Sequence, residues 1–485
     1  MKEEDNLKEE SINGFIWRTA QNVSAQVIGL VIQIVLARIL LPSEYGLVSL
    51  NSVIITILNV IVQTGFTSSI IQKKEITEID KSSMFYFSVS IGVIMYIIVF
   101  LCSPVVANFY DEPLLESVLR VQAISIVIIS LYSVHNAIIM RNLDFKKNFI
   151  ASLIGVFFQG FIGIGMALKG YGVWALVFGT LSLNIANCIA ILIILKWRPK
   201  LLFSFKSIKG MVSFSSKILA GNLLNTIFNS SKTLVIGKVF NSAMVGYYNR
   251  GYLFPATMVT GIDGAMTTVL FSSLSRVQHD RSRFVNYLRK SMKTSLTVVT
   301  PLLCGMAAVS DPMIRFLLTD KWVSAVPFVM ISCVICLFWP LTAKNQALNA
   351  VGRSGTNLLL NIMTKVVSLA LLYLSIPFGV YVIVISSLIG DIISIAIYTV
   401  IISKYCSYSI KQQIMDVIPI YALGGFMFIC TYGLSSVLIM NNFVKLCILI
   451  IFGAAIYVGV SYTFKMEGFM YILQLLRSKI KKSTE

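Results

Sequence analysis

Long apolar stretches, separated by short polar loops, repeat along most of the chain. Each stretch has about 20 residues, the length of an α-helix that crosses the hydrocarbon core of a bilayer. A helix also satisfies its own backbone hydrogen bonds in lipid. The pattern predicts an all-α integral membrane protein with about fourteen transmembrane helices. The expected spans lie near residues 16–40, 45–71, 84–108, 117–140, 149–168, 171–195, 211–237, 243–270, 294–311, 323–349, 356–376, 379–402, 416–439 and 443–464.

Composition and charge placement agree with a membrane protein. Hydrophobic residues make up 56% of the chain and charged residues only 13%. The formal net charge is +19, and most Lys and Arg residues lie in alternate loops, such as 196–209 and 276–293. The positive-inside rule places these loops and both termini in the cytoplasm, which requires an even number of spans. This placement accounts for the basic excess, so we expect no nucleic-acid partner.

The sequence offers little for catalysis. It has no P-loop motif, so ATP-driven pumping is not expected. Cys333 and Cys336 form a CxxC pair, but they lie in an apolar stretch with no second pair and no nearby histidine. Buried packing is the ordinary role of such cysteines. We therefore expect no enzyme activity, no catalytic residues, no metal site and no cofactor.

An internal repeat organises the spans. Residues 37–46 (ARILLPSEYG) align without a gap with residues 237–246 (GKVFNSAMVG), at the ends of the first and seventh spans. Residues 171–174 (YGVW) and 378–381 (FGVY) likewise open the sixth and twelfth spans. Because six is an even number, the two six-span units have the same orientation in the membrane. Parallel repeats with a binding site between them are a common plan of secondary transporters.

The repeat sets the expected domain boundaries. We expect an N-terminal six-helix lobe over residues 1–195 and a cytoplasmic linker over 196–211. The second six-helix lobe covers 212–403, and 404–485 adds two helices and a basic cytoplasmic tail. The fold class is therefore two six-helix lobes in parallel repeat with two extra C-terminal helices.

Polar residues form stripes along several spans. Arg18, Asn22 and Gln26 are spaced four apart, and Asn225, Asn229 and Lys232 are spaced four and three apart, so each set shares one helix face. Unsatisfied polar groups in lipid cost several kcal/mol each, so such faces either hold helices together or line a wet cavity. Lys344, Asn361 and Lys365 add polar and basic positions in later spans.

The charged residues within the spans favour a wet cavity over helix–helix contacts alone. A lysine at the centre of a span costs roughly 2.5–3.5 kcal/mol, and the clearly intramembrane acids are only Asp263 and Asp391. Snorkelling to an interface is the alternative for Lys344. A cationic, amide-rich cavity suits an anionic, hydroxyl-rich substrate. Asp263 and Asp391 are candidates for ion coupling or are partners of the lysines. The predicted substrate-binding residues are Arg18, Asn22, Gln26, Asn225, Asn229, Lys232, Lys344, Asn361 and Lys365.

Short motifs over residues 10–400 resemble the Wzx-type flippases of the polysaccharide transporter family. That family belongs to a superfamily that includes multidrug and toxic compound extrusion (MATE) proteins. The matching segments are residues 36–46, 65–74, 170–176, 197–199, 236–238, 246–250, 270–276 and 321–322. At 231–232 the chain has Ser-Lys where many members have an Asn-Asp-type pair. A coupling role of that acid therefore does not transfer to this chain.

The resemblance implies a MATE-like fold and a rocking carrier that moves a polyprenyl-diphosphate-linked oligosaccharide across the bacterial inner membrane. The oligosaccharide would be the repeat unit of an O-antigen, a capsule or an exopolysaccharide. We expect the lipid-linked oligosaccharide and the bilayer as partners, with contacts to a glycan polymerase and other assembly proteins. A MATE-like multidrug or cation exporter is the first alternative, although it would favour acidic cavity residues. A membrane glycan polymerase or ligase is the second alternative, and a scaffold for the assembly machinery is the third.

Overall fold

The computed structural model describes residues 17, 21, 24–73, 75–277 and 280–474. It describes the side chains of these residues except 64–68, 213–214, 217, 263–269, 271–273 and 275–276. Within this part of the chain, all regular secondary structure is helical. The chain forms two compact units, residues 1–246 and residues 247–485.

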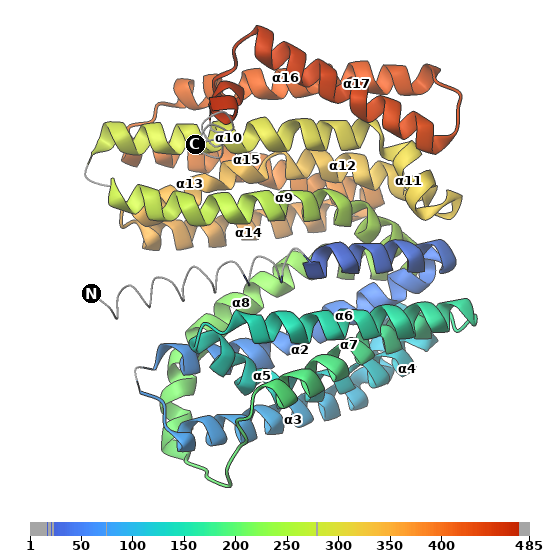
Figure 1. Ribbon diagram of the computed structural model, residues 1–485, viewed down its shortest axis with the longest axis vertical. Helices are drawn as coiled ribbons and strands as arrows, with labels where there is room; N and C mark the ends of the chain where they lie inside the picture. Colours follow the sequence, from blue (N-terminus) through green and yellow to red (C-terminus); the bar gives the residue numbers. More distant parts are fainter. Residues whose placement is uncertain (1–16, 18–20, 22–23, 74, 278–279, 475–485) are drawn as a thin grey trace, which may run out of the picture. The chain divides into compact units, whose positions relative to one another are not determined.

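The first unit is a bundle of long helices. In it α6 packs along α7, α2 packs against α5 and α8, and α3 packs against α5 (Figure 1). Its helices are Ser24–Ile39, α2 (Pro42–Gln72), α3 (Glu78–Tyr110), α4 (Pro113–Gln122), α5 (Ile124–Arg141), α6 (Phe145–Leu168), α7 (Val173–Ile194) and α8 (Phe205–Val239).

Glycines allow α6 and α7 to cross closely. A Cβ atom on Gly155 would lie 3.0 Å from the Leu183 carbonyl oxygen, and one on Gly179 would lie 3.3 Å from the Gly163 Cα. In a membrane, where lipid is as apolar as leucine, close backbone approach supplies much of the attraction between helices. The small residues of these two spans therefore fix the α6–α7 pair.

The second unit begins within α9 and contains the rest of the chain. In it α10 packs along α16, α14 along α15, and α16 along α17 (Figure 1). Its helices are α9 (Ser242–Arg276), α10 (Arg281–Ala308), α11 (Ser310–Leu318), η1 (Asp320–Ala325), α12 (Val326–Cys336), η2 (Trp339–Thr342), α13 (Ala343–Ala350), α14 (Ser354–Ser375), η3 (Ile376–Phe378), α15 (Val380–Cys406), α16 (Ile410–Val437) and α17 (Asn442–Thr463).

The core of the second unit follows a four-residue spacing on α10. Phe284, Leu288 and Met292 are almost fully buried and pack with Tyr398 of α15 and Ile420 of α16. Residues four apart lie on one face of a helix. Arg283, Lys290 and Lys293 point away from this apolar face by helical spacing, so α10 has one apolar and one basic face.

Polar side chains fix where the helices near the basic loops begin. The Thr77 hydroxyl accepts a hydrogen bond from the Asp80 backbone N–H (3.2 Å), and the Asp80 carboxylate accepts one from the Thr77 N–H (2.9 Å). Ser409 and Gln412 form the same reciprocal capping box at the start of α16. These boxes satisfy backbone donors that a helix start leaves unpaired.

The all-α membrane fold is confirmed, but the count of fourteen spans is not. Ten helices of the described chain are long and apolar enough to cross a membrane, or eleven if the bent pair α10–α11 is one span. The remaining expected spans correspond to the shorter apolar helix Ser24–Ile39 and to α8 and α9. The polar stripe of α8 lowers the mean hydropathy of this helix. The same polar residues that predicted a water-facing surface therefore make α8 less apolar than the ten helices that qualify as spans.

Both pairs of segments that the internal repeat aligns have matching local structure. Gly172 (φ +55°) and Gly379 (φ +98°) both precede a long helix, α7 and α15, in a conformation that favours glycine. In the first unit, Gly46 packs on the Ser242 carbonyl and Gly246 packs on the Pro42 carbonyl. The alignment of the repeat pairs Pro42 with Ser242 and Gly46 with Gly246. Each glycine therefore packs on the residue that starts the other helix.

The boundary between the two compact units is defined by helix packing, whereas the predicted lobe boundaries were defined by the sequence repeat. Because α8 packs on α2 and α3, it belongs to the unit that ends at Gly246. The lobe boundaries at 195, 211 and 403 therefore stay a prediction.

Candidate functional site

The polar stripe of the first unit lies on α8. Asn225 and Asn229 are exposed, while Lys232 is partly buried and interacts with other groups. Gln26, on the helix Ser24–Ile39, is also exposed, whereas Arg18 and Asn22 lie outside the described residues. The described members thus present amides and one ammonium group on exposed or partly exposed helix faces.

The amides of the second unit form a hydrogen-bonded cluster on α13, α14 and α15. Asn361 donates to the Asn357 carbonyl oxygen (2.9 Å), and Asn357 donates to the Asn349 side-chain oxygen (3.0 Å). Tyr398 donates its hydroxyl proton to the Asn357 side-chain oxygen (2.8 Å). This arrangement is the interhelical hydrogen bonding that polar residues supply in membranes. Asn361 is partly exposed, so it joins this cluster to the surface.

Lys365 continues the stripe of Asn361 one helical turn further along α14 and is partly buried. Asp391 lies on the neighbouring α15 and is also partly buried. Both residues interact with other groups. Next to Asp391, a Cβ atom on Gly390 would lie 2.6 Å from the Ser368 hydroxyl, so α14 and α15 approach closely here. The Asp263 side chain lies outside the described residues.

Lys344 is the most buried of the predicted cations. Its side chain is on α13, the residue is 2% exposed, and its ammonium group donates to the Thr399 hydroxyl at 2.6 Å. In the described chain, this hydroxyl is its polar partner and no carboxylate pairs with it. Gln413, from α16, donates to the Thr399 carbonyl oxygen (3.0 Å). Lys344 thus lies in a packed junction of three helices, where its charge is desolvated.

Replacing Lys344 by methionine is expected to raise the free energy of unfolding by about 1 kcal/mol or more, because it removes a buried charge that no carboxylate compensates. Thermal unfolding of the purified protein in detergent measures this change. Lys404→Met, at an exposed position on α15, is the matched control and should leave the unfolding temperature nearly unchanged. A clear loss of stability in Lys344→Met alone would contradict the expectation.

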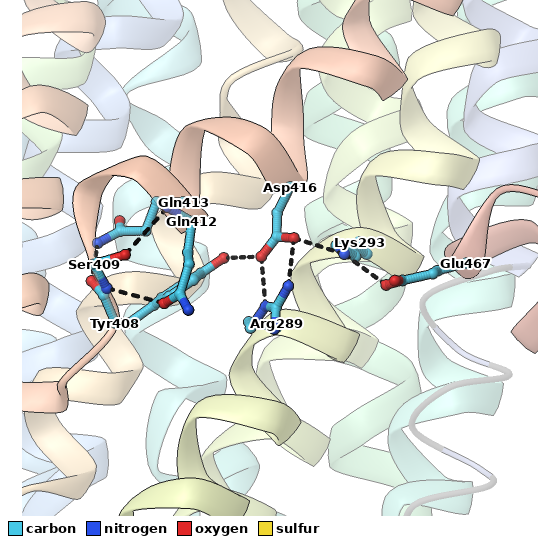
Figure 2. Close-up of polar contacts among 8 residues, drawn as sticks. All are labelled: Arg289, Lys293, Tyr408, Ser409, Gln412, Gln413, Asp416 and Glu467. Atoms are coloured by element: carbon cyan, nitrogen blue, oxygen red, sulfur yellow. Dashed lines mark hydrogen bonds and ion pairs between the residues drawn. The ribbon is translucent and has the colours of Figure 1, made fainter.

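A charged cluster that sequence reasoning missed surrounds Asp416 on α16 (Figure 2). Its carboxylate accepts from the Arg289 guanidinium at 2.6 and 2.7 Å and pairs with the Lys293 ammonium at 2.6 Å. The Tyr408 hydroxyl donates to the same carboxylate at 2.6 Å. Burial raises the pKa of Tyr408 well above its usual range, so this hydroxyl stays protonated. Asp416 is a buried carboxylate held by three donors.

Asp80 has a related role in the first unit. Its carboxylate, at the start of α3, pairs with Lys73 at 2.6 Å and accepts from the Ser207 hydroxyl of α8. Both acids lie near a helix start beside a basic loop. The sequence signal was therefore an Asp at the edge of a span with basic residues in the neighbouring loops.

Comparisons with known proteins agree on one family. The sequence profile described as polysaccharide biosynthesis protein matches residues 35–327. The chain is 25% identical over 346 residues to the lipopolysaccharide biosynthesis protein WzxC of Escherichia coli, covering 68% of each. It is 24% identical over 352 residues to the teichuronic acid biosynthesis protein TuaB of Bacillus subtilis, covering 72% of this chain and 73% of the relative.

Solved structures show the same fold. The lipid II flippase MurJ, in an inward closed conformation, superposes with a TM-score of 0.74 at 18% identity and covers 93% of this chain and 98% of its own. An inward-facing MATE family multidrug resistance transporter superposes with a TM-score of 0.61 at 15% identity, covering 79% and 95%. The predicted MATE-like fold class is therefore confirmed.

Proposed function

The chain belongs to the polysaccharide biosynthesis protein family, and from that premise we propose that it is a flippase for a lipid-linked oligosaccharide. It moves a polyprenyl-diphosphate-linked repeat unit from the inner to the outer leaflet by alternating access. The repeat unit is that of an O-antigen, a capsule or another exopolysaccharide. The match to this family over more than half of the chain carries the proposal.

The polar residues of the spans support an anionic, sugar-bearing substrate. The exposed amides of α8 offer donors and acceptors to sugar hydroxyls. Lys232, on the stripe of α8, and Lys365, on the stripe that α14 carries with Asn361, add ammonium groups that can bind a diphosphate. We propose that these residues contact the head group, and that Asp263 and Asp391 are the candidates for ion coupling.

The proposed reaction is transport without covalent change, so the protein is not an enzyme and needs no catalytic residue or cofactor. We place it in the bacterial inner membrane with both termini in the cytoplasm. This orientation keeps the basic loops on the cytoplasmic side, as the positive-inside rule expects. The bilayer and the lipid-linked substrate are its partners, and a glycan polymerase is the expected recipient of the product.

Replacing Lys232 or Lys365 by alanine is expected to lower the translocation rate about tenfold or more, because each change removes a charged hydrogen bond to phosphate. The measurement is flipping of a fluorescent polyprenyl-diphosphate oligosaccharide in proteoliposomes. The Lys→Arg changes, which keep the charge, should retain more activity.

The matched control is Lys169→Ala, because Lys169 is an exposed lysine at the end of α6. It should flip substrate at the normal rate. Normal flipping by both Lys232→Ala and Lys365→Ala, with normal insertion, would remove these lysines from the site. A covalently altered product in the same assay would overturn the proposal of a transporter.

A further inference from the structure

A large cavity in the second unit lies outside the predicted substrate-binding residues. It has a volume of about 980 Å³ and is lined by α10, α16, α17 and residues 464–468, which follow α17. A smaller adjoining cavity of about 250 Å³ shares Arg289, Lys293 and Glu467 with it and adds Lys290 and Tyr471. The combined space is large enough for a small amphiphilic molecule.

One part of this cavity is apolar and open to its surroundings. Met415 and Phe426 of α16 are 62% and 53% exposed, and Phe464, just after α17, is 77% exposed. At 1.5 Å per residue, the stretch from Met415 to Phe426 is about 16 Å long. That length accommodates most of one fatty acyl chain laid along the helix.

The other part of the cavity is charged. Arg289, Lys293 and Lys465 contribute three cations to its lining, and Asp416 and Glu467 contribute two carboxylates. Asp416 is 7% exposed and bound by several donors, so it is a fixed part of the wall. The lining therefore carries one net positive charge even with Glu467 in place, which favours an anion such as a phosphodiester.

Glu467 is the displaceable group at this end. Its carboxylate pairs with the Lys293 ammonium at 2.6 Å, yet its side chain is 77% exposed while that of Lys293 is 14% exposed. The Glu467 carboxylate is already mostly in contact with water, so it stays solvated when it leaves the pair. A phosphate oxygen that entered the cavity would therefore replace the Glu467 carboxylate beside Lys293 at little cost. Lys465 lines the same cavity.

The position along the helices suits the membrane interface. The charged end lies near the starts of α10 and α16 and the end of α17, and all three adjoin basic segments. Basic pockets between membrane helices at this level bind anionic lipid head groups. The apolar stretch of α16 extends from there into the span, as an acyl chain extends from its head group.

We propose that this cavity binds an anionic glycerophospholipid of the surrounding bilayer, with its phosphodiester beside Lys293 and Lys465 and one acyl chain along α16. The lipid is a bound component distinct from the transported substrate. It joins α10 to α16 and α17, the helices that follow the second predicted lobe. Glu467 occupies the phosphate position when the lipid is absent.

The test measures binding of phosphatidylglycerol and of phosphatidylcholine to the purified full chain in detergent by native mass spectrometry. The expected result is that phosphatidylglycerol binds at least about fivefold more tightly. Lys465→Gln should weaken its binding about fivefold, whereas Glu467→Gln, which removes the competing carboxylate, should strengthen it. Neither change touches the pairs of Asp416 with Arg289 and Lys293, so both variants keep that anchor.

Lys411→Gln is the matched control, because Lys411 is exposed on α16 but does not line the cavity. It should bind phosphatidylglycerol as the unaltered chain does. Equal binding of the two phospholipids, or weaker binding by Glu467→Gln, would overturn the proposal. Tenfold tighter binding of a polyprenyl phosphate in competition with phosphatidylglycerol would assign the cavity to substrate and also overturn it. Flipping assays of the same variants separate this outcome from failure of the proposed transport function.

Discussion

Replacing Gly46 or Gly246 by alanine is expected to remove most of the folded protein from the membrane. A Cβ atom on Gly46 would overlap the Ser242 carbonyl, and one on Gly246 would overlap the Pro42 carbonyl. Backbone atoms cannot move aside as a flexible side chain can, so the helix starts must separate. Overpacking of this kind costs about 1–3 kcal/mol or more. Fluorescence-detected size-exclusion chromatography of membrane extracts measures the remaining folded fraction.

The matched control for this prediction is Gly261→Ala. Gly261 lies on α9, the same helix as Gly246, and a Cβ atom there would meet nothing within 4 Å. Its replacement should leave the folded fraction unchanged or slightly higher, because alanine favours the helix. Normal folding of both Gly46→Ala and Gly246→Ala would show that the reciprocal contact does not hold the first unit together.

The contact between the Gly46 and Gly246 segments shows which features of the fold can be predicted from the sequence. Alignment of residues 37–46 with 237–246 predicted that the two segments are equivalent. It gave no reason for them to touch, because a repeat specifies similar local structure and not which surfaces meet. The reciprocal packing of the two glycines depends on backbone approach that only the folded bundle defines.

The same limit applies to the predicted cations. Hydropathy predicted that Lys344 lies within a span, since a lysine among apolar residues is conspicuous. Whether such a lysine faces a wet cavity or a packed junction depends on its neighbours. Thr399, its hydrogen-bond partner, lies 55 residues away in the chain. The sequence therefore identified the residue but not its surroundings.

Asp416 was missed for a related reason. It lies at the edge of an expected span, where a carboxylate resembles an ordinary loop residue. Its partners Arg289 and Lys293 lie about 120 residues earlier, in a basic segment that the positive-inside rule already explained. Their pairing became visible only when α10 and α16 were seen to pack along each other.

Replacing Asp416 by alanine is expected to lower the free energy of unfolding by about 3–5 kcal/mol, because it leaves the partly buried Arg289 guanidinium without its counter-ion and Lys293 with only the exposed Glu467 carboxylate. The Arg289 and Lys293 side chains are 32% and 14% exposed, so water compensates them only in part. The Tyr408 hydroxyl also loses its acceptor. Thermal unfolding of the purified protein in detergent provides the measurement, as a marked fall in the unfolding temperature.

Two further variants distinguish the effect of losing the Asp416 charge from a nonspecific loss of stability. Asp416→Asn keeps an oxygen that accepts from Tyr408 but removes the charge, so its loss of stability should be intermediate. Asp311→Ala removes one partner of Arg315, which retains Asp320 and is itself 35% exposed. That change should cost no more than about 1 kcal/mol, as is usual for exposed ion pairs. Equal losses in Asp416→Ala and Asp311→Ala would mean that burial does not strengthen the Asp416 cluster, and α16 would then be held to α10 by apolar packing alone.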